Sequence, residues 1–157
     1  MIAMDARLMA DNILKELGHE PTSGQRDAIE QLAVFITRPV EPRTQPAFLL
    51  RGYAGTGKTT LVSALVRVLP FAGLQSVLMA PTGRAAKVLA RYSRKKAHTI
   101  HRKIYRLFVD GEGRYKMIPA PNPNKFTLFI VDEASMIAGD TSAGEGGIYA
   151  NRDLLDN

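Results

Sequence analysis

The chain has 157 residues, and its hydrophobic content of 45% and charged content of 23% are those of an ordinary globular domain. It contains no cysteine and three histidines, which excludes disulfides and thiolate zinc sites and disfavours a histidine-based metal site. With a net charge of +6, no apolar run long enough to span a membrane and no signal-peptide pattern, the sequence predicts a basic, single-domain, cytoplasmic protein.

Two amphipathic helices are predicted at the start of the chain. Residues 4–17 carry apolar side chains at helical spacing, and Thr22 with Gln25 forms the pattern of a capping box for the second helix. The second helix is expected to end before the three prolines of residues 39–46, which indicate a surface connection. We therefore expect residues 1–45 to form an N-terminal helical part.

Residues 52–59 read G-x-x-x-x-G-K-[ST], the pattern of a phosphate-binding loop. The apolar residues 47–50 predict a strand before the loop, and a helical spacing of leucine and valine follows it. Glycines let successive N–H groups point inward at phosphates, and the helix N-terminus adds a partial positive charge. The sequence predicts binding of a nucleoside triphosphate, with Lys58 on the β- and γ-phosphates and the Thr59 hydroxyl on Mg²⁺; a glycine-rich turn that binds nothing is the alternative. The predicted nucleotide-contacting residues of this segment are Gly52, Ala54, Gly55, Thr56, Gly57, Lys58, Thr59 and Thr60.

The excess positive charge lies in one segment. Residues 84–106 contain nine of the 21 basic residues and no acidic one, which leaves 12 basic against 15 acidic residues elsewhere. We interpret this segment as a surface that meets a polyanion, although a solvated basic helix face has the same composition. In and before it, the sequence predicts a strand at 76–80, a helix at 82–92 and a short helical turn at 98–102.

A hairpin and a strand are predicted in the last third of the chain. Residues 105–118 alternate around an Asp-Gly-Glu-Gly turn, which favours a β-hairpin, and an apolar strand at 127–131 ends in Asp132 and Glu133. Because the carboxyl ends of parallel strands meet at one edge of a sheet, we expect Asp132 to hold Mg²⁺ and Glu133 to polarise an attacking water. Residues 139–157 are expected to be mobile.

Strands that alternate with helices predict an α/β fold, a parallel sheet with helices on both faces. The nucleotide-binding part should span residues 46–138, with the hairpin inserted at about 104–125.

Four segments together resemble one protein family. In order and spacing they resemble motifs I, Ia, Ib and II of the superfamily 1 DNA helicases of the RecD-like group, over residues 20–138; the segments are Gly52–Thr59, Ala80–Ala86, His98–Arg102 and Val131–Met136. The resemblance implies a three-layer, RecA-like P-loop NTPase domain that hydrolyses ATP with Mg²⁺ and moves 5′ to 3′ along single-stranded DNA. It implies catalytic roles for Lys58, Asp132 and Glu133.

The resemblance also implies contacts to the base and to DNA. Gln25 is expected to read adenine, in addition to or instead of capping its helix. The hairpin is expected to be a wedge for the duplex, with Tyr105, Phe108 or Tyr115 stacking on a base, although aromatic residues in a hairpin are more often packing residues. For His101, a structural role is the alternative to a DNA contact. The implied DNA-contacting residues are Thr82, Gly83, Arg84, Lys87, Thr99, His101 and Arg102.

The sequence lacks several parts that the family has. A second RecA-like domain with its arginine finger, and a Gly-Asp-x-x-Gln segment, are absent, so we interpret the chain as the N-terminal motor domain of a longer protein. We expect the missing strand to leave residues 47–51 as a bare sheet edge that favours self-association. A P-loop kinase or phosphotransferase and a non-catalytic nucleotide-binding module are the alternative functions.

Overall fold

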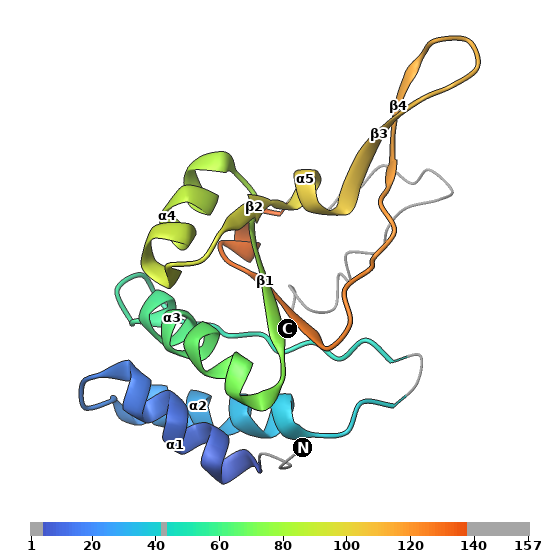
Figure 1. The fold of residues 1–157 in the computed structure, drawn as a ribbon. Coiled ribbons are helices and arrows are strands. Elements are labelled where there is room, and N and C mark those ends of the chain that lie inside the picture. Colours follow the sequence, from blue (N-terminus) through green and yellow to red (C-terminus); the bar gives the residue numbers. More distant parts are fainter. Residues whose placement is uncertain (1–4, 42–43, 138–157) are drawn as a thin grey trace.

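A computed structural model describes residues 5–41 and 44–137 of the chain (Figure 1). No helix of this described part is long and apolar enough to cross a membrane. In chain order the elements are α1 (Ala6–Leu17), α2 (Ser23–Thr37), α3 (Lys58–Val68), the 3₁₀ turn η1 (Leu69–Ala72), β1 (Gln75–Ala80), α4 (Gly83–Ser93), β2 (Ala97–Thr99), α5 (Ile100–Ile104), β3 (Tyr105–Val109), β4 (Tyr115–Pro119), β5 (Thr127–Val131) and the 3₁₀ turn η2 (Ala134–Met136).

Short polar side chains set the start of both N-terminal helices. The Asp5 carboxylate accepts a hydrogen bond from the N–H of Leu8 at 2.7 Å and caps α1, which ends at Gly18 in the left-handed conformation. At α2 the Thr22 hydroxyl accepts from the N–H of Gln25 at 3.2 Å, and the Gln25 side chain accepts from the N–H of Thr22 at 3.0 Å. The predicted capping box is confirmed.

The main hydrophobic core lies between α1, α2 and α3. Figure 1 shows α1 and α2 against α3, on the side away from α4. The Arg67–Glu16 ion pair, at 2.8 Å, joins the surfaces of α3 and α1. Each large side chain buried here stabilises the fold by about 1.5–3 kcal/mol relative to exposure. The fully buried members include Met9, Ile13, Ile29, Leu61, Val68 and Leu69.

Three parallel strands form the sheet in the order β2-β1-β5, with β1 in the centre. Leu78 of β1 is fully buried in a second cluster with Val66 of α3 and Leu89 of α4, and Ala97 and Ile130 pack against it from the two outer strands. The fold class is therefore α/β as predicted, a parallel sheet flanked by helices with a small antiparallel hairpin.

Two sequence predictions about strands were wrong. Residues 47–50 form no strand, because no described strand pairs with them, although Phe48 and Leu50 still pack against the main core. The short strand β2 lies where a helical turn was predicted, so His98 is in the sheet, and the helix α5 begins only after Thr99. β2 has only three residues, Ala-His-Thr, and these show no apolar alternation that would predict a strand.

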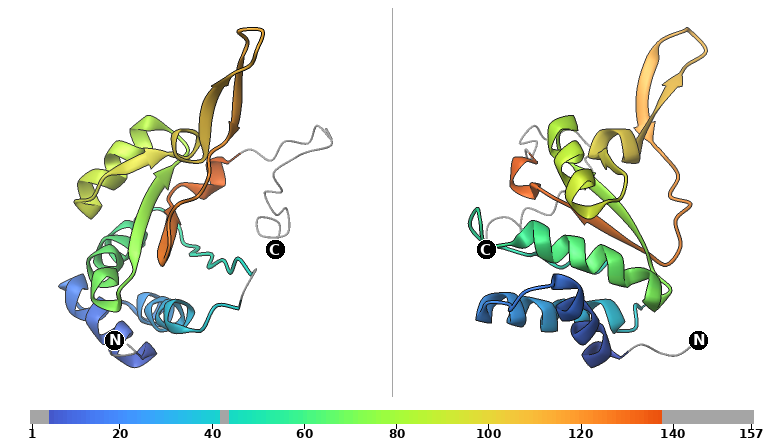
Figure 2. Two further views of the ribbon diagram at one scale, coloured as in Figure 1. Left: turned by 45° about the vertical axis from the view of Figure 1, so that its right-hand side comes forward. Right: turned by 60° about the vertical axis from the view of Figure 1, so that its left-hand side comes forward.

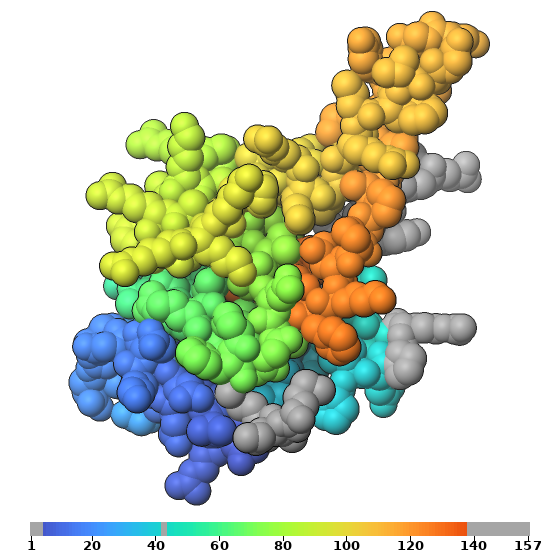
Figure 3. All heavy atoms as spheres, in the orientation of Figure 1, coloured from blue at the N-terminus to red at the C-terminus, as the bar shows by residue number. Residues whose placement is uncertain are grey.

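The predicted hairpin is confirmed. Its strands β3 and β4 pair in antiparallel register from Tyr105 opposite Pro119 to Val109 opposite Tyr115. The hairpin stands out from the body of the molecule in all the views (Figures 2 and 3). Residues 139–157, for which mobility was expected, lie outside the described residues.

Candidate functional site

Glycines shape the loop between residues 52 and 57. Gly55 and Gly57 have φ of 81° and 84°, in the left-handed region that other residues avoid. At Gly52 an added Cβ would lie 2.7 Å from the Thr56 hydroxyl oxygen, so a side chain there would force the Thr56 side chain to move. Gly57 precedes α3 and supplies no side-chain cap. The first N–H groups of α3 therefore lack a side-chain acceptor and can bind an anion.

The Lys58 ammonium lies against this loop. It donates to the carbonyl oxygens of Gly52 and Tyr53, the latter at 2.8 Å, and its side chain is half-buried. The Thr56 hydroxyl donates to the same Tyr53 oxygen at 2.8 Å and tightens the turn. A held ammonium beside uncapped N–H groups is the donor set that phosphate oxygens require.

Gln25 contacts the loop from α2. Its Nε2 donates to the carbonyl oxygen of Thr56 at 3.0 Å, across 31 positions of sequence. The structure thus brings Gln25 into contact with the loop of residues 52–57. Two bonds leave one donor and one acceptor of the amide for other partners.

Asp132 and Glu133 follow the carboxyl end of β5. The N–H of Asp132 bonds to the Met79 carbonyl at 3.0 Å and continues the pairing with β1, while the Asp132 carboxylate accepts from the N–H of Glu133 at 3.0 Å. Glu133 has a φ of 54°, which holds an exposed carboxylate in a strained backbone conformation. Because β5, β1 and β2 are parallel, Asp132 and Thr82, which follow β5 and β1, lie at the same end of the sheet as Thr99, the last residue of β2.

The oxygen ligands available suit Mg²⁺. Thr59, in the first turn of α3, carries a hydroxyl, and Asp132 carries a carboxylate. Both residues are partly exposed. Within residues 5–41 and 44–137, no group of three or more histidine or acidic side chains could hold a metal alone. Mg²⁺ usually binds through one or two protein oxygens together with phosphates and waters, and a hydroxyl and a carboxylate are oxygen ligands of that kind.

Helix α4 carries an exposed basic face. Arg84, Lys87 and Arg91 recur at spacings of three and four and are exposed. In the part of the chain that the structure describes, none of the basic side chains of residues 84–106 forms an ion pair with a carboxylate. Lys95 differs from the others, because its ammonium donates to the Ser76 hydroxyl at 2.8 Å.

The hydroxyls of Thr82 and Thr99 cap α4 and α5. Thr82 accepts from the N–H of Ala85 at 3.2 Å, and Thr99 accepts from the N–H of Arg102 at 3.3 Å. Helix α5 follows β2 directly, α4 follows β1 after Pro81 and Thr82, and each helix has a basic side chain in its first turn. The arrangement places two helix N-termini, Gly83 and the basic residues at one edge of the sheet.

The two histidines of this region have different surroundings. Burial lowers the pKa of His98, and the charges of Lys96, Lys103 and Arg102 lower it further, so the neutral form is favoured. The ring of His101 stacks on that of Tyr105, with centroids 5.8 Å apart. His101 therefore has a packing partner at the base of the hairpin, and the same side chain is exposed.

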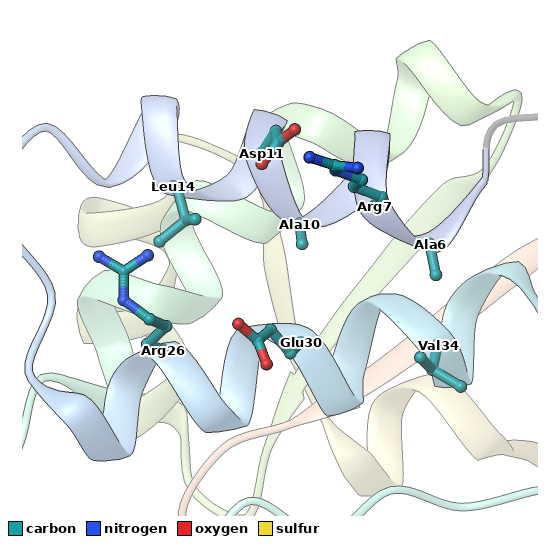
Figure 4. A pocket seen from close by; sticks show the side chains of 8 residues that line it. All are labelled: Ala6, Arg7, Ala10, Asp11, Leu14, Arg26, Glu30 and Val34. Carbon is teal, nitrogen blue, oxygen red and sulfur yellow. The ribbon is translucent and has the colours of Figure 1, made fainter.

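A groove between α1 and α2 lies apart from these residues. It has a volume of about 350 Å³, and Figure 4 shows side chains of both helices along it. Arg26 at its edge is paired with Glu20 at 3.1 Å. None of the predicted site residues lines it; the lining residues are Ala6, Arg7, Ala10, Asp11, Leu14, Arg26, Glu30 and Val34.

The loop, the helix that follows it and the parallel sheet define a P-loop nucleotide-binding domain. Residues 21–143 match the AAA domain family, and the chain belongs to this family.

Curated proteins that are similar to the chain include two DNA helicases. It is 37% identical over 89 residues to the ATP-dependent RecD2 DNA helicase of Deinococcus radiodurans, a match that covers 57% of the chain and 12% of that protein. It is 37% identical over 118 residues to the ATP-dependent DNA helicase dda of Enterobacteria phage T4, covering 73% of the chain and 26% of the relative. The chain thus spans at most about a quarter of these relatives. No solved structure gives a significant match.

Proposed function

We propose that the chain is the ATP-binding motor part of a 5′–3′ DNA helicase that hydrolyses ATP to move along single-stranded DNA. The observation that carries the proposal is the loop of residues 52–57, which holds the Lys58 ammonium and leads into the uncapped start of α3. The names of the two relatives, both ATP-dependent DNA helicases, support the choice of reaction.

The roles of the nucleotide site follow from its donors and acceptors. Lys58 and the loop N–H groups bind the β- and γ-phosphates, and Thr59 and Asp132 hold Mg²⁺, which neutralises phosphate charge when bound. Glu133 accepts a proton from the attacking water. Gln25 reads adenine through the donor and acceptor that its two bonds leave free. Ala54, Gly55, Thr56 and Thr60 complete the phosphate contacts.

Single-stranded DNA is proposed to follow the edge that carries the starts of α4 and α5. Thr82, Gly83 and Arg84 with Lys87 contact one stretch of backbone, and Thr99, His101 and Arg102 contact another. The support is that the α4 basic side chains are exposed and, among the described residues, unpaired with acids. The hairpin is proposed to be the duplex wedge, because Phe108 and Tyr115 are 47% and 72% exposed.

One set of variants tests both halves of the proposal. We expect the 157-residue chain to bind Mg-ATP and to hydrolyse it very slowly, since an arginine finger, implied by the family to lie in another domain, contributes a factor of about 10³–10⁵. Lys58→Ala should abolish binding. Arg84→Ala/Lys87→Ala should leave ATP binding intact and flatten the log–log salt dependence of single-stranded DNA binding by about 0.7 per lost contact.

The control for the DNA half is Arg26→Ala, because the guanidinium of this α2 residue is already paired with Glu20, in the connection before α2. An unchanged salt slope in the double variant would remove α4 from the DNA path. Turnover of a small phosphate acceptor, without stimulation by DNA, would support a kinase instead. Rapid DNA-stimulated turnover that Lys58→Ala abolishes would show that no further domain is needed.

A further inference from the structure

The Gln25 side chain joins two segments that are distant in sequence, the first turn of α2 and the phosphate loop. Its Oε1 accepts from the N–H of Thr22 at 3.0 Å, and its Nε2 donates to the carbonyl oxygen of Thr56 at 3.0 Å. Gln25 is half-buried, and both bonds come from one planar amide. The position of the loop is therefore coupled to the capped end of α2.

The same amide fills the space beside Gly57. A Cβ at residue 57 would lie 2.3 Å from Nε2 of Gln25, closer than side-chain atoms can approach. The φ of 84° at Gly57 turns the chain into α3, and Lys58 is the next residue. Gln25 thus packs and bonds against the turn that aims the first N–H groups of α3 and the Lys58 side chain.

This contact is independent of the base of a nucleotide. The Thr56 carbonyl belongs to the loop, and the free donor and acceptor of the amide remain available to adenine. A role in base reading alone leaves the Thr56 bond and the fit against Gly57 unexplained.

We propose that Gln25 is a positioning residue for the phosphate loop, which its amide holds in the shape that binds phosphates whether or not a base is attached. The identity of the ligand in this inference rests on the proposed nucleotide-binding function. The effect of Gln25 on the nucleotide-free loop does not depend on that function. Gln25 would thus contribute to nucleotide binding in two ways, by reading adenine and by holding the loop that binds the triphosphate.

The key variant is Gln25→Glu in the 157-residue chain. A carboxylate still accepts from the N–H of Thr22, as glutamate does in many capping boxes, but it cannot donate to the Thr56 carbonyl. The matched control is Thr22→Ala, which removes the capping hydroxyl and keeps the Gln25 donor. In the nucleotide-free protein, ¹⁵N order parameters of Gly55 and Thr56 should fall from about 0.85 toward 0.6 in Gln25→Glu. They should fall much less in Thr22→Ala, because the Gln25 donor to the Thr56 carbonyl is retained.

Binding of Mg-tripolyphosphate, which has no base, supplies the second readout. The uncharged variant Gln25→Ala should weaken tripolyphosphate binding by about three- to tenfold, the loss of one net hydrogen bond, and ATP binding by at least that factor. Unchanged loop order parameters, with ATP binding weakened and tripolyphosphate binding unchanged, would overturn the inference. If the wild-type chain bound neither ligand, the proposed function would fail, while the order parameters would still decide whether Gln25 holds the loop.

Discussion

Single residues in the loop carry much of what the sequence predicted, because their chemistry is local. Lys58 and the glycines at 55 and 57 could be placed from spacing alone, since a phosphate loop needs positive φ and an ammonium at fixed positions. The bond from Gln25 to Thr56 could not be predicted, because it joins residues 31 positions apart and depends on how α2 packs. The strain at Glu133 likewise depends on the chain that leaves β5.

Glu133 provides a test of strain at the proposed catalytic centre. Its φ of 54° lies in the left-handed region, which is unfavourable for residues other than glycine. After glycine, asparagine is among the residues that tolerate this region best. We expect Glu133→Asn to raise the free energy of unfolding by about 0.5–1 kcal/mol and to abolish ATP hydrolysis. Chemical denaturation and an ATPase assay measure the two effects.

Phe126→Asn is the matched control for this prediction. Phe126 also has a left-handed φ, of 48°, and its side chain is 78% exposed, so asparagine should stabilise the protein similarly without changing nucleotide binding. Asp132→Asn, at a residue without positive φ, should give no gain in stability. A loss of stability in Glu133→Asn would show that its carboxylate makes a compensating interaction in the folded state.

At the scale of elements, local signals predicted well and pairing signals did not. The capping box of α2 and the turn of the hairpin are specified by residues three to five positions apart, and both were confirmed. Residues 47–50 have the composition of a buried strand, but a strand also needs a hydrogen-bonding neighbour. β2 has that neighbour in β1, although its three residues carry no strand pattern of their own.

The hairpin turn makes a prediction about pH. The backbone N–H of Arg114 donates to the Asp110 carboxylate, and this hydrogen bond lowers the pKa of Asp110 from its ordinary value of 3.8. The side chains of Arg114 and Lys116, which form ion pairs with the same carboxylate, lower the pKa further. A lowered pKa in the folded hairpin means that Asp110 stabilises it above the unfolded pKa and that this stabilisation is lost as pH falls through the folded value. Amide exchange of Phe108 and Tyr115, followed from neutral pH to below 3.8, should show the hairpin opening.

Asp110→Asn is the control, because the amide does not titrate. This variant should have a less protected hairpin at neutral pH and should lose most of the acid dependence. If wild type and variant showed the same dependence below the ordinary aspartate pKa, another carboxylate would have to control the turn. The body of the protein serves as the internal reference, since among the described residues the hydrogen bonds and ion pairs of the Asp110 side chain all lie within the hairpin.

At the scale of the whole molecule, the unpaired edges of the sheet decide whether one copy of the chain associates with another. The sequence predicted a bare edge at residues 47–51, but these residues do not join the sheet. Among the described residues, β5 is an outer strand of the sheet, and its five residues are Thr-Leu-Phe-Ile-Val. Phe129 and Val131 of this strand are 39% and 36% exposed. A short apolar strand with a free row of N–H and C=O groups is a template for pairing with another chain.

We therefore expect the 157-residue chain to self-associate as its concentration rises, by pairing of β5 edges around a two-fold axis. Phe129→Lys should shift the equilibrium toward the monomer, because a charge on an edge strand opposes pairing. Phe71→Lys is the matched control, since Phe71 is 75% exposed on η1 and lies on no strand. Sedimentation velocity across a hundredfold range of concentration measures the effect. Equal association of both variants would place the contact elsewhere, and a strict monomer with protected β5 amides would mean that the β5 edge is already covered within one chain.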